Sequence, residues 1–472
     1  MVLRSIFLLV FIMCLGYGSI AQLTTINIRD FGAIPNDNKS DHEAFKKAAK
    51  YINKRRKNVK LIIGAGRYIV GPKFKYDGKN EIIQYDALDD VINLTGCTGI
   101  IIEGTGKVNI VFADKIPIGI VSKNKIPVRG LDPGSMFRLV GCSNITISNI
   151  NADGNNNKLK YYENSGLGAN AHERDHDGLF LMNSQHIRVK NASFNHFVRD
   201  GCVILGDTNK LPVFNISFAG CNFDNNGRNG VSWTAGDSVS FYNCNFRNTS
   251  TGIVTTNPGA GLDIEPERGA YCSRGKFIKC EFSGNRGYAV TSGDPRTWDV
   301  LFDSCRIIGT NSYALYTTSP RMVFKNTLLA GSCLLYCAAD KVENGLQFFN
   351  CNFTDSVKDH KVFTLTYVAG IIGSYQRFYD CSFTGYKVPT VYTEISKKNL
   401  QDDSENCLFQ RCTFSALYTV PGSYNQHGFL VNNSIFNSCT FKTSGYTDFT
   451  YILNEGMRKN RQKNSAFIKV KQ

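Results

Sequence analysis

The chain has 472 residues, 42% of them hydrophobic and 20% charged, and its formal net charge is +15. This composition excludes a disordered chain and is sufficient for a large hydrophobic core. The positive charge favours a polyanion as partner. Because the basic residues are scattered along the chain, they do not indicate a nucleic-acid-binding face.

Residues 1–22 predict a secretory signal peptide. Arg4 provides the positive start and Ile6–Leu15 the apolar stretch, and a run of small residues follows as a cleavage site. The apolar stretch is too short to span a membrane. We therefore expect a secreted, periplasmic or cell-surface protein without stable membrane insertion. It would consist of one folded domain over residues 23–455 and a basic tail over residues 456–472.

The first folded residues predict a short strand and turn over residues 26–33 and an amphipathic helix over about residues 40–57. Ser40 and Glu43 have the spacing of a capping box at the start of that helix. The expected apolar stripe of the helix consists of Ala44, Phe45, Ala48, Ala49 and Ile52.

From residue 144 to residue 441 the sequence repeats one pattern, Φ-x-Φ-x-x-[Cys/Asn]-x-Phe, where Φ is apolar. Alternation with period two predicts strands, and a fixed slot that recurs every ~20–30 residues predicts a solenoid. The fold class is therefore all-β, a single-stranded parallel β-helix whose open end the N-terminal helix covers. The slot is filled by Cys221, Cys244, Cys280, Cys305, Asn326, Cys351, Cys381, Cys412 and Cys439.

Sixteen cysteines occur, and Cys14 falls in the predicted signal peptide. The remaining odd number argues against a complete disulfide framework. Side chains stacked in one slot of successive coils are also poorly aimed for disulfides. We expect these cysteines to be buried, unpaired core residues.

The opening of the folded region resembles that of the pectate lyase superfamily. Asp30-Phe31-Gly32-Ala33 is followed by a turn rich in Asp and Asn and then by the amphipathic helix, as in those pectin-lyase-like proteins. The resemblance implies a right-handed β-helix with an N-terminal capping helix, and activity on a polysaccharide, for which acidic sugars fit the charge of the chain.

Two short motifs look like those of polygalacturonases, although the match is partial. His176-Asp177-Gly178 and Asp200-Gly201-Cys202 correspond to two of the family's motifs, so Asp177 and Asp200 would match two of three catalytic acids. Gly201 stands where the third acid is expected, which puts true polygalacturonase activity in doubt.

In each of these coils, a second strand opens with glycine and an apolar residue. When the coils are aligned on that glycine, the two acids fall in one column. The residues before glycine are Asp177, Asp200, Asn229, Ala260 and Arg286. Carboxylates on adjacent coils would lie ~5 Å apart and repel, so one would hold a proton as a general acid. His176, Arg199, Arg228 and Arg286 would bind substrate beside them. The alternative is that Asp-Gly simply favours a turn.

A second acidic group is Asp263 with Glu265. Leu262 and Ile264 should point inward, which directs both carboxylates outward. They fit a catalytic acid/base pair or, together with Glu267, ligands for Ca²⁺. The alternative is a solvated strand pair with Arg268 or Arg286 as partner.

The segment 155–174 interrupts the coils near these columns. It contains Tyr161, Tyr162, His172, Glu173 and Arg174. The tyrosines could stack on sugar rings as a binding wall, or could pack within an ordinary loop.

Three functional hypotheses follow. The first is a secreted glycoside hydrolase that cleaves an acidic polysaccharide by carboxylate acid/base catalysis and requires no cofactor. The second is a polysaccharide lyase or epimerase that uses Ca²⁺ and Arg268, Arg286 or Arg296 as base. The third is a noncatalytic glycan-binding or surface β-helix.

Overall fold

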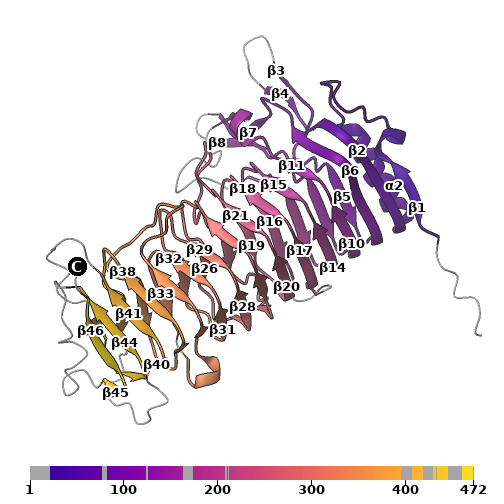
Figure 1. Cartoon of the computed structure of the whole chain (residues 1–472). Helices are drawn as coiled ribbons and strands as arrows, with labels where there is room; N and C mark the ends of the chain where they lie inside the picture. The colour runs from indigo at the N-terminus through magenta and orange to yellow at the C-terminus, as the bar shows by residue number, and fades with distance from the viewer. Residues whose placement is uncertain are drawn as a thin grey trace, which may run out of the picture.

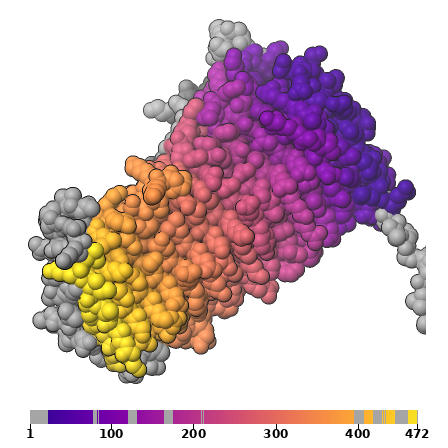
Figure 2. All heavy atoms as spheres, in the orientation of Figure 1, coloured from indigo at the N-terminus to yellow at the C-terminus, as the bar shows by residue number. Residues whose placement is uncertain are grey.

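A computed structural model describes residues 22–76, 82–123, 126–162, 174–207, 210, 212–337, 339–394, 407–417, 429–431, 433–444 and 460–470. The chain winds into one elongated parallel β-helix, with the N-terminal coils at one end and the C-terminal coils at the other (Figures 1 and 2). This confirms the predicted β-helix. The predicted signal peptide lies outside the described residues, apart from its last residue.

One face of the β-helix is a sheet of twelve described parallel strands, called sheet 1 here. Its strands are β5 (Ile92–Thr95), β9 (Phe137–Val140), β13 (Leu179–Met182), β16 (Asp200–Leu205), β19 (Asn229–Trp233), β22 (Leu262–Ile264), β26 (Val290–Ser292), β30 (Leu315–Thr317), β33 (Cys333–Tyr336), β36 (Ala369–Ile372), β39 (Val391–Glu394) and β42 (Phe429–Leu430).

The other faces form a continuous sheet, sheet 2, to which most coils contribute two strands separated by a tight turn. Its strands are β1 (Thr24–Asn27), β2 (Lys57–Val70), β6 (Thr98–Phe112), β10 (Ser143–Ser148), β11 (Asn151–Asp153), β14 (Gln185–Lys190), β15 (Ser193–Asn195), β17 (Phe214–Ala219), β18 (Asn222–Asp224), β20 (Gly236–Tyr242), β21 (Asn245–Arg247), β23 (Cys272–Ser273), β24 (Lys276–Ile278), β25 (Glu281–Ser283), β27 (Thr297–Trp298), β28 (Val300–Asp303), β29 (Arg306–Ile308), β31 (Met322–Lys325), β32 (Leu328–Ala330), β34 (Gln347–Phe349), β35 (Asn352–Thr354), β37 (Arg377–Tyr379), β38 (Ser382–Gly385), β40 (Cys407–Gln410), β41 (Thr413–Ala416), β43 (Ser434–Asn437), β44 (Thr440–Thr443), β45 (Arg461–Lys463) and β46 (Ala466–Lys469).

Smaller elements project from the N-terminal half. β3 (Phe74–Tyr76) and β4 (Ile82–Tyr85) form a hairpin, and β7 (Pro117–Lys123), β8 (Ile126–Leu131) and β12 (Lys160–Tyr161) form a small sheet. The helices are α2 (His42–Arg55) and the 3₁₀ turns η1 (Ile28–Phe31), η2 (Asn156–Lys158) and η3 (Val342–Asn344). No helix in the described ranges is long and apolar enough to cross a membrane.

The turn between the two sheet 2 strands of a coil explains the repeated pattern. Its first residue has a left-handed backbone, with φ of 49° at Asn191 and 51° at Asn243, a conformation that asparagine tolerates well. The next residue enters the core, and there the cysteine slot lies. All fifteen described cysteines are buried and free, which confirms the prediction. The assignment of Asn326 to this slot was wrong: Asn326 is the turn residue, and Thr327, 1% exposed, fills the slot.

Inside the coils, phenylalanines stack in rows parallel to the helix axis. One row has ring centroids 4.5–5.1 Å apart between neighbouring coils. It consists of Phe218, Phe241, Phe277, Phe302, Phe324, Phe348, Phe378, Phe409 and Phe436. Trp233 is fully buried, as predicted. Because inner rows fix the register of each coil, they also fix which side chains become neighbours on the outer faces.

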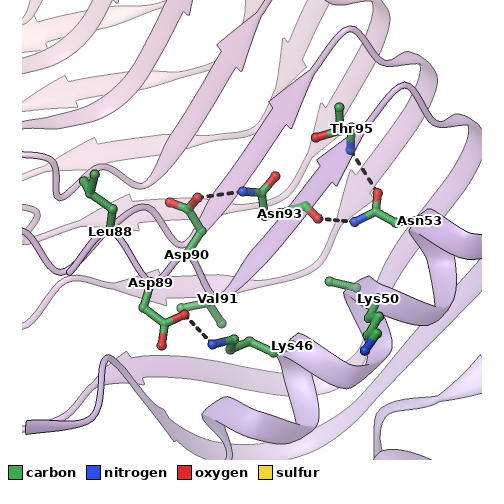
Figure 3. Close-up of a pocket in the computed structure, with 10 residues that line it drawn as sticks. Lys46, Lys50, Asn53, Leu88, Asp89, Asp90, Val91, Asn93 and Thr95 are labelled. Carbon is green, nitrogen blue, oxygen red and sulfur yellow. Dashed lines mark hydrogen bonds and ion pairs between the residues drawn. The ribbon is translucent and has the colours of Figure 1, made fainter. Parts of the chain in front are cut away.

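Helix α2 covers the N-terminal edge of sheet 1, as predicted. The Asn53 side chain donates to the Asn93 carbonyl (2.7 Å) and accepts the Thr95 N–H (2.9 Å), so it occupies the open edge of β5. Beside it lies an open hollow of about 430 Å³, where Lys46 pairs with Asp89 (Figure 3).

The start of α2 differs from the predicted capping box. Asp41 is the N-cap residue, and its carboxylate accepts the N–H groups of Ile34 and Ile69 rather than those of the helix. Glu43 pairs with Lys73 (2.8 Å) instead of bonding back. The acidic side chains therefore attach the helix to the first coil.

The C-terminal segment also differs from the expectation. Residues 456–472 were expected to be a solvated basic tail, but β45 and β46 within them pair in parallel with β43 and β44. The basic segment therefore adds a further coil to the β-helix.

Candidate active site

Asp177, Asp200 and Asn229 link successive coils at the start of the sheet 1 strands. Each side chain accepts a backbone N–H from the next coil: Asp200 N to Asp177 Oδ1 (3.3 Å), Asn229 N to Asp200 Oδ1 (3.1 Å), and Ala260 N to Asn229 Oδ1 (3.0 Å). All three side chains are buried. We call Asp177, Asp200 and Asn229 the inner ladder, and it follows the column that the sequence alignment placed before glycine.

The two carboxylates of the inner ladder each have their own arginine. Arg199 donates to both oxygens of Asp177 (2.8 and 2.5 Å), and Arg228 does the same to Asp200 (2.9 and 2.5 Å). Arg199 also pairs with Asp175. Burial raises the pKa of Asp177, and the charge of Asp200 adds to this rise, as the predicted repulsion requires. Neither side chain is exposed, however, so the structure does not place the two carboxylates where a substrate could reach them. Arg199 and Arg228 are engaged by the ladder rather than by a substrate.

His176 is fully buried, so its side chain is not accessible to a substrate, contrary to the expectation. Its Nδ1 accepts the Val198 N–H (3.0 Å), and its ring lies 4.5 Å from Phe112 and 5.2 Å from Phe197. Burial lowers the pKa of His176 to about 3, so the ring is neutral.

Arg286 does not belong to the column of Asp177 and Asp200, in which the glycine alignment had placed it. Asp263 is in register with Thr291, and the glycine alignment had paired it with Ala289, two residues earlier. The turn between β25 and β26 has the same length as the one between β18 and β19, so Ala289, and not Gly287, is equivalent to Gly230. Arg286 donates to Ser250 Oγ (3.1 Å) and Asn257 Oδ1 (2.8 Å) and has no acidic partner among the ladder residues.

Tyr161 and Tyr162 have the environment of loop packing. The Tyr161 hydroxyl donates to the Asn156 carbonyl (2.6 Å), and burial raises the pKa of Tyr161. The Lys160 ammonium lies 5.5 Å from the Tyr162 ring. The interpretation of these tyrosines as sugar-stacking residues is therefore not supported. His172 and Glu173 lie outside the described residues, and Arg174 pairs with Asp132 (3.5 Å).

Asp263 occupies the outer face of sheet 1, as the alternation predicts. Leu262 and Ile264 are fully buried in the core, and Asp263 lies between Ser232 and Thr291 of the neighbouring coils. Its side chain is nevertheless 9% exposed, and its Oδ2 accepts the Asn229 side-chain N–H (3.2 Å). Glu265 follows the strand and is exposed.

The surroundings of Asp263 favour its protonated form. Burial raises its pKa to about 7, and the charges of Glu265 and Asp200 act in the same direction. Arg228 and the hydrogen bond from Asn229 oppose this rise without cancelling it. Unlike Asp177 and Asp200, Asp263 has no arginine bonded to it in the described structure. A carboxyl that exchanges a proton near neutral pH is what general acid catalysis requires.

Three tyrosines beside Asp263 were not found from the sequence. Tyr288 lies 5.5 Å from Tyr316 and 6.2 Å from Tyr313, measured between ring centroids, and all three are partly exposed. Burial raises the pKa of Tyr288, and the nearby Asp263 charge is among the causes. The signal that could have found them is the register of Tyr316 with Thr291, which the glycine alignment obscured.

The turn after β22 carries the remaining candidates. Glu267 and Arg268 are exposed, and Arg296 donates to Asp294 and to the Pro266 carbonyl. Within the described ranges, no three His, Cys, Asp or Glu side chains gather as a metal-ion site. Ca²⁺ binding by Asp263, Glu265 and Glu267 stays a prediction.

Comparisons with known proteins agree with this architecture. The family model described as "Right handed beta helix region" matches residues 211–383. The fold is a right-handed parallel β-helix. The resemblance to the pectate lyase superfamily is thus confirmed at the level of the fold. No curated protein matches the sequence.

Two solved structures illustrate the fold. The N-terminal fragment of gene product 12 of bacteriophage Phi29 is similar with a TM-score of 0.55 and 12% identity, over 94% of this chain and 70% of that one. A tailspike protein of E. coli bacteriophage HK620, in complex with a pentasaccharide, is similar with a TM-score of 0.50 and 10% identity, over 94% and 78%. At these identities the likeness concerns the fold alone.

Proposed function

We propose that this chain is an exported carbohydrate-active enzyme, a glycoside hydrolase that cleaves an acidic polysaccharide. The observation that carries the proposal is Asp263, a carboxyl on the outer face of sheet 1 whose pKa is raised to about 7. Its neighbours Tyr288 and Tyr316 offer partly exposed rings against which the apolar face of a sugar can pack.

Three further features support a saccharide partner outside the cytoplasm. The net charge of +15 suits a polyanionic substrate. Residues 1–22 have the pattern of a signal peptide. A tailspike of the same fold has been solved with a bound pentasaccharide.

In the proposed reaction Asp263 is the acid. It donates its proton to the glycosidic oxygen as the bond from that oxygen to the anomeric carbon breaks. Glu265, exposed on the same side, is the second carboxylate: it takes a proton from an attacking water or itself attacks the anomeric carbon before water releases the sugar. In both routes one water is consumed and one reducing end appears.

The test is a screen of the purified chain on polygalacturonate, alginate and the neutral polysaccharide xylan. We expect new reducing ends without the ultraviolet absorbance of an unsaturated product. Asp263→Asn and Glu265→Gln should each lower turnover by about 100-fold or more. Glu343→Gln, at an exposed carboxylate in η3, is the control and should keep full activity.

Each other outcome rejects the proposal in a different way. If the Asp263→Asn, Glu265→Gln double variant is active, the assignment of these two residues as the catalytic acids is wrong. An unsaturated product would point to a lyase, and binding without turnover would point to a noncatalytic glycan-binding protein.

A further inference from the structure

A column of outer-face residues runs along sheet 1 from Asp263 toward the C-terminal coils. The strand pairings place its members in register from one coil to the next. We call it the outer column, and it consists of Asp263, Thr291, Tyr316, Leu334, Gly370 and Tyr392. At ~4.8 Å per coil, its five steps span roughly 24 Å.

Aromatic side chains lie along this column. Beside Thr291 and Tyr316, the ring of Tyr313 approaches that of Phe363 at 6.3 Å. Farther on, Tyr367 covers Gly370, where a Cβ atom would lie only 2.2 Å from the tyrosine ring. Tyr367 also stacks on Tyr392 at 5.4 Å with an interplanar angle of 9°.

Together these partly exposed rings form an aromatic track of Tyr288, Tyr313, Tyr316, Phe363, Tyr367 and Tyr392. On the other side of Asp263 the outer face is different. Phe180, Val203 and Leu205 form a closed apolar cluster there, each at most 7% exposed, and the Arg138 guanidinium lies 4.1 Å from the Phe180 ring. The track therefore extends from the acid in one direction only.

The loop that supplies Phe363 and Tyr367 also carries positive charge. Lys358 and Lys361 are exposed in this loop, between β35 and β36, and the Asp359 carboxylate between them pairs with Arg306. Aromatic rings that pack against the apolar faces of sugars, with ammonium groups beside them, match the chemistry of a linear chain of uronic-acid sugars.

We propose that the aromatic track binds consecutive sugar rings of a linear acidic polysaccharide, which would extend from Asp263 toward the C-terminal coils. This inference rests on the proposed function for the choice of ligand. It adds that affinity is asymmetric about the acid and grows with the length of the chain. The coils beyond residue 340, interpreted from the sequence as scaffold, then form the distal part of the binding face.

The experiment measures binding of oligogalacturonates and oligomannuronates to the Asp263→Asn chain by calorimetry, with a disaccharide and a hexasaccharide of each. We expect the hexasaccharide of one series to bind at least about tenfold more tightly than its disaccharide. Tyr392→Ala should weaken hexasaccharide binding about five- to tenfold and leave disaccharide binding unchanged. Tyr392→Phe keeps the ring and should bind like the parent.

The chain offers a matched control on the other sheet. Tyr379 stacks on Phe349 at 5.0 Å and 11° on the outer face of sheet 2, so Tyr379→Ala removes a similar ring pair away from the track. It should leave binding unchanged. Equal losses from Tyr379→Ala and Tyr392→Ala, affinity that does not depend on chain length, or no binding of either series would overturn the inference.

The result also separates this inference from the proposed function. If Asp263→Asn still cleaves polysaccharide while Tyr392→Ala selectively weakens the hexasaccharide, the assigned acid is wrong and the track stands. If Asp263→Asn is inactive and Tyr392→Ala binds like the parent, the assignment of Asp263 as the acid is supported and the inference about the aromatic track is wrong.

Discussion

Asp263→Asn should change how stability depends on pH, because the folded chain holds the Asp263 proton more tightly than the unfolded chain does. Folding raises the pKa of this carboxyl from 3.8 to about 7, mainly through burial. At about 1.4 kcal/mol for each tenfold change in proton affinity, the rise corresponds to about 4 kcal/mol.

The sign follows from proton linkage. Between pH ~4 and ~7 the folded state binds more protons at this site than the unfolded state, so this carboxyl makes stability fall as pH rises. Below pH ~4 both states are protonated and the penalty is absent, whereas above pH ~7 it is complete. Asparagine has no proton to lose. As pH rises from ~4 to ~7, the free energy of unfolding of the variant should therefore increase relative to that of the parent protein by up to about 4 kcal/mol.

Urea unfolding at pH values from 4 to 8 measures this effect, with Trp233 fluorescence as the probe. Trp233 is fully buried and is in register with Ile264, next to Asp263. Glu343→Gln, at an exposed carboxylate, is the control and its curve should follow that of the parent. If the difference in unfolding free energy between Asp263→Asn and the parent is the same at pH 4 and pH 8, the carboxyl is not protonated by its surroundings and the argument fails.

Four more outcomes follow from the structure. Arg228→Met should lower the free energy of unfolding by about 3–5 kcal/mol because it leaves a buried carboxylate uncompensated. Arg274→Met, at an ion pair on the surface, should shift the urea midpoint far less, and similar midpoints for the two variants would contradict this. Turnover should fall as pH rises above about 7, where Asp263 loses its proton, and a rate that keeps rising with pH would oppose it. The free thiols should react with a thiol reagent only after unfolding, and labelling of the native chain would refute their burial. Asn53→Ala should cost about 1–3 kcal/mol by leaving backbone groups of β5 unpaired, seen as faster hydrogen exchange at residues 92–95.

The fold was predictable because each coil repeats the same environment. Period-two alternation marks the strands, and the slot that holds Cys221 and Cys244 is buried in each described coil from Ala192 to Cys439, so one short pattern indicates the solenoid. The same alternation correctly directed Leu262 and Ile264 inward and Asp263 outward. These inferences depend only on local geometry along a strand.

The lateral neighbours were harder to predict because the glycine used to align the coils does not stand at the equivalent position in every coil. Gly287 looked like a strand start, but it lies in a turn against Pro258, whose carbonyl oxygen would be 1.9 Å from an added Cβ. This error placed Arg286 in the wrong column and concealed the tyrosines. The cover that Tyr367 provides over Gly370 comes from a loop without periodicity, so no repeat could reveal it.

The ion pairs between these acids and arginines could not be predicted from the sequence either. Adjacent Asp-Gly motifs suggested repulsion between Asp177 and Asp200, because the alignment revealed their proximity but not the direction of the arginine side chains. In the structure each arginine lies one coil beyond its acid and reaches back to it. At these two positions the Asp-Gly motif therefore links neighbouring coils.

The contrast between these acids is the strongest physical argument that Asp263 has a function. Burial of a carboxylate without a bonded cation destabilises a protein, and the bonded arginines reduce that cost at Asp177 and Asp200, although burial still raises the pKa of Asp177. At Asp263 no bonded cation reduces this cost in the described structure. The side chain that bonds to Asp263 is the neutral Asn229, and Glu265 adds a repelling charge. A serine, as at the equivalent Ser232, or a threonine, as at Thr291, fits the same column without this penalty. The proposed catalytic role of Asp263 would account for a titrating acid at a position where smaller neutral residues fit.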